Sequence, residues 1–126
     1  MISDVRQRQV MDPSSTPHGK IAFEFASALV SGDFEKAHEL LAGSEKLEWS
    51  SSDLRNEFEQ MIDYGGGPPN HIEVMNVMDD WPKKIPGDVG WAYAAIAGDG
   101  YSEGIAVVVC SENGNHRIRQ IEWGRP

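Results

Sequence analysis

The sequence predicts an α+β fold in which three N-terminal helices pack on a strongly bent, cone-shaped four-stranded antiparallel sheet. Apolar residues recur at helical spacing as far as Ile62, and from His71 onward they alternate with period two. Glycines and prolines over residues 65–69 separate the two halves. With 126 residues, 40% of them hydrophobic, we expect a flexible N-terminal arm over residues 1–15 and one domain over 16–126.

Capping residues place the three helices. The first helix begins at Thr16-Pro17, an N-cap followed by proline at the first helical position, and ends at Gly32. The second is capped by Asp33 and stops at Gly43. Residues 47–49 are predicted to be extended, and the serines and aspartate over 50–53 then cap a third helix that ends at residues 65–67.

Four strands are predicted over residues 71–81, 89–97, 101–110 and 116–123. In the first strand, Ile72, Val74 and Met78 share one face. Asn113-Gly114 is a strong hairpin signal between the last two strands. A two-residue turn there places Val109 opposite Ile118 and Val107 opposite Gln120.

The charge balance argues against several partners. The chain has 11 basic and 20 acidic residues and a net charge of −9, which disfavours binding to nucleic-acid phosphates or to an anionic membrane surface. It contains no apolar run of the ~20 residues that a membrane span needs. Cys110 is the single cysteine, which fits a reducing compartment, so we expect a cytoplasmic protein.

The acidity is concentrated between residues 21 and 112, and much of it lies on the second and third helices and the loop between them. Residues 21–112 carry 17 acidic and 5 basic side chains, whereas residues 113–126 carry an excess of basic ones. Four acidic residues on the second and third helices are candidates for contacting a partner: Glu35, Glu39, Asp53 and Glu57. Ordinary solubility is the alternative explanation for their presence.

The order of elements resembles the nuclear transport factor 2-like superfamily, the cystatin-like cone shared with ketosteroid isomerase and polyketide cyclases. The residues that carry the resemblance are the first helix with 26–30, the stretch 31–37, the third helix, and the final strand with 118–123. This superfold hosts enzymes, binding modules and bacterial immunity proteins. The resemblance implies a possible homodimer through the outer sheet face, to which Val107 or Ile105 would contribute.

Catalysis in the isomerase and cyclase branches uses a general-base carboxylate inside the apolar cone. By position, the resemblance makes Glu48 the nearest candidate, and Glu103, Asp79 and His38 are further candidates. The alternative is that the carboxylates are solvated strand-end residues and that His38 lies at the edge of the core. The spacing of acidic residues and histidines gives no metal-ligand set, so we expect no metal and no cofactor.

The aromatic residues of the strand half are candidates for partner or ligand binding: Trp81, Trp91, Tyr93 and Tyr101. Trp91 and Tyr93 share one face of their strand, and such side chains form either core or a binding hot spot. Two functions therefore compete. The favoured one is a non-catalytic protein-binding module, in a specific form an immunity protein that neutralises a basic toxin. The alternative is a small-molecule binder or an isomerase-, cyclase- or dehydratase-type enzyme.

Overall fold

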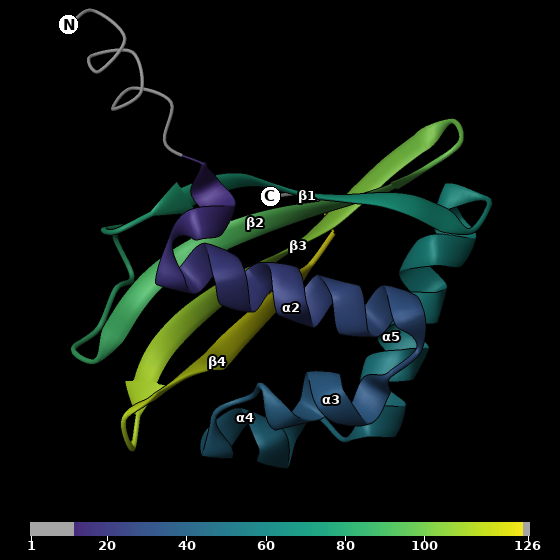
Figure 1. Ribbon diagram of the computed structural model, residues 1–126. Helices are drawn as coiled ribbons and strands as arrows, with labels where there is room; N and C mark the ends of the chain where they lie inside the picture. Colours follow the sequence, from purple (N-terminus) through teal and green to yellow (C-terminus); the bar gives the residue numbers. More distant parts are fainter. Residues whose placement is uncertain (1–11, 125–126) are drawn as a thin grey trace, which may run out of the picture.

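The computed structural model describes residues 12–124 and has the predicted α+β class, with helices preceding an open four-stranded antiparallel sheet (Figure 1). The helical elements are η1 (Pro13–Ser15), α2 (Pro17–Ser31), α3 (Phe34–Glu39), α4 (Gly43–Glu48) and α5 (Ser51–Gly65). The strands, in sheet order, are β1 (Pro69–Met78), β2 (Asp88–Gly98), β3 (Tyr101–Glu112) and β4 (Asn115–Trp123). Of the predicted arm, residues 1–11 lie outside the described residues, and the remainder includes η1.

The predicted caps of the first helix and the starts of the other two are confirmed. The predicted end of the second helix at Gly43 is wrong, because α3 ends at Glu39 and Gly43 is the first residue of α4. The Thr16 hydroxyl accepts a hydrogen bond from the Gly19 backbone N–H at 3.0 Å, and α2 ends at Gly32, whose φ of 82° is left-handed. At the start of α5, Ser50 and Asp53 form a reciprocal capping box, with both bonds at 3.0 Å.

The extended conformation predicted for residues 47–49 is wrong as far as residue 48, because α4 covers residues 43–48. This helix depends on contacts that are distant in sequence. The Glu112 carboxylate, at the end of β3, accepts from the Gly43 backbone N–H at 3.2 Å. Just before it, Leu41 forms a parallel bridge with Ile118, which ends α3 at Glu39 and covers the free edge of β4.

Two β-bulges shift the predicted strand faces. The β1–β2 register breaks between Val74 and Asn76, so Met75 is an extra, exposed residue. After this break, Val77 packs against the core in the place predicted for Met78.

In the β3–β4 pair, Val109 lies opposite Ile118 as predicted. A second break follows, so that Val107 pairs with Ile121 and not with Gln120. The residue inserted at this break in β4 is Arg119.

One hydrophobic core fills the space between the helices and the inner face of the sheet, which is the face that α2 covers (Figure 1). α2 packs chiefly on β2, where Gly90, Ala92 and Ala94 are small enough to allow close approach. Ile105 and Val107 also belong to this core and are each 1% exposed. The expectation that these two residues lie on the outer face is therefore wrong.

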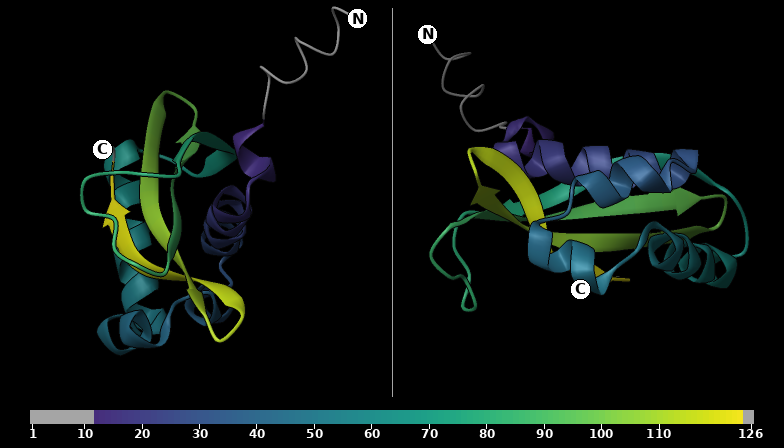
Figure 2. Two further views of the ribbon diagram at one scale, coloured as in Figure 1. Left: turned by 90° about the vertical axis from the view of Figure 1, so that its left-hand side faces the viewer. Right: turned by 90° about the horizontal axis from the view of Figure 1, so that it is seen from below.

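The opposite, outer face carries Trp91, Tyr93, Ala106 and Val108 on its two central strands. Trp91 and Tyr93 thus share a face, as predicted. The loop of residues 79–87, which joins β1 to β2, swings away from α2 toward this outer side (Figure 2). None of the described helices is long and apolar enough to cross a membrane.

Candidate functional site: an aromatic groove and an acidic helical surface

The outer face of the sheet is hollowed by a groove of about 330 Å³. Its apolar lining consists of Met78, Trp81, Pro82, Trp91 and Val108. Lys83, Gln120 and Glu122 supply its polar lining. We call this feature the outer groove. Both tryptophans are half-buried, so each indole has an accessible part that a partner could cover.

The 79–87 loop positions Trp81 through hydrogen bonds of its own. The Lys84 backbone N–H donates to the Trp81 carbonyl at 3.1 Å, and the Lys84 ammonium donates to the Asp79 carbonyl at 2.6 Å. The same ammonium lies 5.7 Å from the centroid of the Trp81 ring, within cation–π range. Lys84 therefore contacts both Asp79 and Trp81 and links the positions of these two residues.

The far end of this loop is anchored by an ion pair that spans the sheet. Arg119 donates two hydrogen bonds to the Asp88 carboxylate, at 2.6 and 2.7 Å, and the Asp88 side chain is 1% exposed. This bidentate contact holds the pKa of Asp88 below its usual range and raises that of Arg119. Asp88 also accepts from the Ile85 backbone N–H at 3.0 Å, so the pair fixes the loop to β4.

The two tyrosines in the predicted set differ from the tryptophans in their surroundings. The Tyr101 hydroxyl donates to the Gly67 carbonyl at 2.7 Å, and its ring occupies the space beside Gly98. This hydrogen bond ties the start of β3 to the segment that follows α5. The Tyr93 ring lies over Gly104, where a Cβ would be 2.4 Å from the phenol oxygen. Both positions combine an aromatic side chain with a glycine that leaves room for it.

The four predicted acidic residues lie on α3 and α5. Glu35, Glu39 and Asp53 are exposed, and Glu57 is half-buried. Asp53 also caps α5, so it has a structural role as well. A second groove, of about 380 Å³, runs between the starts of α3 and α5 and includes Glu35 and Arg55. Of the four acidic residues, Glu35 lines this groove. We call Glu35, Glu39, Asp53 and Glu57 together the acidic helical surface.

The candidate catalytic residues lie in separate places. Glu48 is exposed at the end of α4, and His38 is half-buried on α3. Asp79 follows β1, where Met78 pairs with Trp91, while Glu103 pairs with Ile96. Five residues of β2 separate those two positions, roughly 16 Å along the strand. The sheet thus keeps Asp79 and Glu103 apart.

Apolar side chains fill the interior of the fold. Its largest fully buried members are Phe25, Leu29, Leu41, Leu54, Ile96, Ile105 and Ile118. Among the buried residues that the structure describes, His18 is the only polar or charged one. The carboxylate of Asp88 is also buried, but it is paired with Arg119 and is not part of this core cluster. Within residues 12–124, no three His, Cys, Asp or Glu side chains are grouped to hold a metal ion.

Sequence reasoning missed three polar residues in special environments: His18, Glu45 and Arg119. Burial raises the pKa of Glu45, while hydrogen bonds from the Trp49 side chain and the Ile121 backbone lower it. His18 could have been found, because it precedes Ala22 by four residues and Phe25 by seven on the buried stripe of α2. Glu45 and Arg119 acquire their surroundings only through pairing between distant segments.

No protein-family model matches the chain, and no curated protein sequence matches it.

Proposed function

We propose that this protein is a non-catalytic protein-binding module whose partner is a basic protein. The observation that carries the proposal is the outer groove, in which two half-buried indoles, Trp81 and Trp91, lie on a sheet face that α2 leaves open. Tryptophan is enriched among residues that dominate the binding energy of protein interfaces. The groove combines apolar lining with a polar rim, which is the usual anatomy of such an interface.

Charge indicates the kind of partner. The chain has a net charge of −9, and Glu35 and Glu39 on α3 are exposed to solvent. Exposed charges of one sign speed the encounter with an oppositely charged partner and add little to the final affinity. In this proposal the acidic helical surface attracts the partner, and the outer groove holds it.

A specific form of this function is an immunity protein that neutralises a basic toxin in the cytoplasm of the producing cell. The same acidic charge supports it, since a toxin that acts on nucleic acid must itself be basic. The order of helices and strands is compatible with a nuclear transport factor 2-like domain, a fold that hosts such proteins. If this form is correct, the purified protein will inhibit the activity of the partner that it captures.

The proposal is tested by capturing partners on the immobilised protein from an extract of its own cells, at about 0.05 M and about 0.15 M salt. The W81A/W91A variant removes the groove indoles, and E35K/E39K reverses two acidic charges. Met75→Ala is the matched control, because Met75 is an apolar residue of β1, 53% exposed, that does not line the groove. Thermal unfolding verifies that each variant is folded.

We expect the unmodified protein and Met75→Ala to enrich the same basic protein. W81A/W91A should lose it at both salt concentrations, since removing hot-spot tryptophans costs roughly 2–4 kcal/mol. E35K/E39K should capture less at low salt, with a smaller difference at high salt because screening weakens the attraction. Capture of an acidic protein, or equal capture by all four proteins, would contradict the proposal.

One observation favours the alternative, a small-molecule site. A shallow groove of about 260 Å³ lies between α5 and the start of β3, with Glu57 and Glu103 beside Met61 and Trp123. A carboxylate next to an aromatic ring is the kind of group that the enzyme hypothesis requires. If this groove is the functional site, Glu103→Gln will abolish function and W81A/W91A will leave it intact.

A further inference from the structure

The start of α2 contains a buried histidine with unusual surroundings. His18 is 3% exposed, and neither ring nitrogen has a hydrogen-bond partner in the part of the chain that the structure describes. Its ring packs on Gly90 of β2, where a Cβ would lie 2.3 Å from the imidazole. Buried polar groups are nearly always hydrogen-bonded, so an unpaired one requires an explanation.

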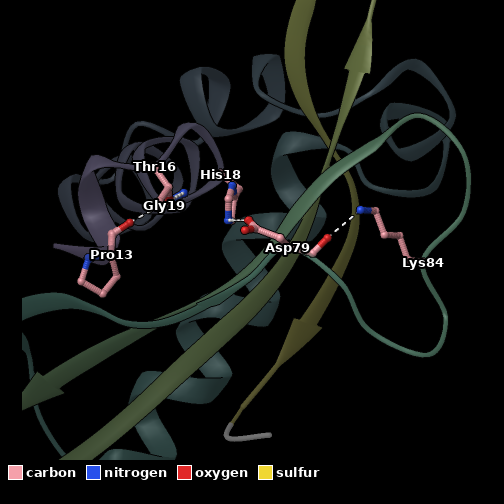
Figure 3. Close-up of polar contacts among 6 residues, drawn as sticks. All are labelled: Pro13, Thr16, His18, Gly19, Asp79 and Lys84. Atoms are coloured by element: carbon pink, nitrogen blue, oxygen red, sulfur yellow. Dashed lines mark hydrogen bonds and ion pairs between the residues drawn. The ribbon is translucent and has the colours of Figure 1, made fainter. Parts of the chain in front are cut away.

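The group facing this histidine is the carboxylate of Asp79. His18 Nε2 lies 3.5 Å from Asp79 Oδ1, close enough for an ion pair but without hydrogen-bond geometry (Figure 3). Asp79 is the first residue of the 79–87 loop, and its side chain is 91% exposed. A small movement of Asp79 toward the ring would close this contact.

Several groups determine the protonation of His18. Burial lowers its pKa, the Asp79 carboxylate opposes this, and His116 at the start of β4 adds to the lowering. Gly90 is the contact from β2 and carries no charge. The charged residues nearest in sequence on η1 and α2, Asp12 and Lys20, are exposed to solvent. His18 is therefore neutral at neutral pH, and its protonation requires a pH below the ordinary histidine value of about 6.5.

We propose that protonation of His18 draws the Asp79 carboxylate onto the imidazolium ring and thereby moves the 79–87 loop, together with Trp81, relative to the outer groove. A charged histidine in this position needs an acceptor, and Asp79 is the carboxylate already within ion-pair distance. Movement of Asp79 is transmitted because the Lys84 ammonium donates to the Asp79 carbonyl (Figure 3). The same ammonium lies over the Trp81 ring.

The consequence for binding rests on the proposed function, because Trp81 lines the surface that we propose for the partner. The movement itself requires no partner. It is measured on the free protein, so a failure of the movement and a failure of partner binding are distinguishable. Acidification would then alter the groove on the outer face through a residue on α2.

The test follows two NMR signals of the free protein between about pH 8 and about pH 5. The imidazole carbon–proton signal of His18 reports its protonation, and the indole N–H signal of Trp81, assigned with Trp81→Phe, reports the loop. We expect both signals to shift with one common midpoint, below the ordinary histidine value of about 6.5.

Three variants make the test specific. Asp79→Asn should lower the His18 midpoint further and stop the movement of the Trp81 signal. His116→Gln should raise the midpoint, with Trp81 still following His18. Asp80→Asn is the matched control, an exposed neighbour, and should change neither signal. The proposal is overturned if Trp81 does not follow His18, if it still does so in Asp79→Asn, or if His18 does not titrate in this range.

Discussion

Asp88 and His18 both have buried, titratable side chains, and both make the free energy of unfolding depend on pH. The pKa of Asp88 is lowered by Arg119, so its stabilising effect is present above the unfolded-state value of about 3.9 and is lost as the pH falls. The pKa of His18 is lowered by burial, so stability falls as the pH drops below about 6.5. Acid therefore destabilises the fold in two separate steps.

We expect Asp88→Asn to reduce the free energy of unfolding by about 1.5–3 kcal/mol at neutral pH, because Arg119 loses a charged, bidentate acceptor. Denaturant unfolding at neutral pH and near pH 3 measures this. The difference from the unmodified protein should shrink as the pH falls below about 3.9, because the unfolded chain then takes up a proton at Asp88 that the folded protein binds less readily. Asp80→Asn, on an exposed carboxylate of the same loop, is the control; an equal loss in that variant would contradict the role of the ion pair.

At the scale of elements, the helices with local caps could be predicted, and the elements held by distant contacts could not. α2 and α5 begin at Thr16 and Ser50, whose side chains bond their own first turns. α4 depends on Glu112, 69 residues from Gly43. Likewise, nothing near Met75 or Arg119 in the sequence marks a bulge, and the register can be read only from the paired strands.

The contrast between local and distant contacts also explains which parts of the candidate site could be predicted from the sequence. Trp91 and Tyr93 could be assigned to one face from their spacing alone. That Trp81 joins Trp91 in a groove depends on the path of the 79–87 loop, which Lys84 and the Asp88–Arg119 pair determine. Tyr101 also has a structural role that its position in the sequence does not reveal, because its hydroxyl donates to the Gly67 carbonyl, 34 residues away.

The capping box of α5 provides a test at this scale. Ser50→Ala should lower the free energy of unfolding by about 1 kcal/mol, because the Asp53 backbone N–H loses its acceptor. Ser52→Ala is the matched control, since Ser52 is an exposed residue inside the same first turn. Thermal or urea unfolding measures both, and a loss of equal size in the two variants would contradict the capping role.

At the scale of the whole molecule, exposed carboxylates lie on the helices and on the strand half, whereas the aromatic groove lies on the outer sheet face. The helices α3 and α5 expose carboxylates, the interior is apolar, and the outer sheet face has the aromatic groove. In the proposed function, the exposed carboxylates attract a partner and the groove retains it, because long-range charge controls the rate of encounter while buried aromatic contacts control dissociation. His18 lies between these parts, at the junction of α2, β2 and the 79–87 loop.

The central claim, that the outer groove is where a basic partner binds, is tested most directly by the indole N–H signals of the protein during titration with the basic protein that it captures. The claim predicts that the signals of Trp81 and Trp91 shift, whereas those of Trp49 and Trp123, which pack against each other on the inner side at 5.7 Å between ring centroids, do not. Shifts confined to Trp123, beside Glu57 and Glu103, would contradict it and assign binding to the other groove.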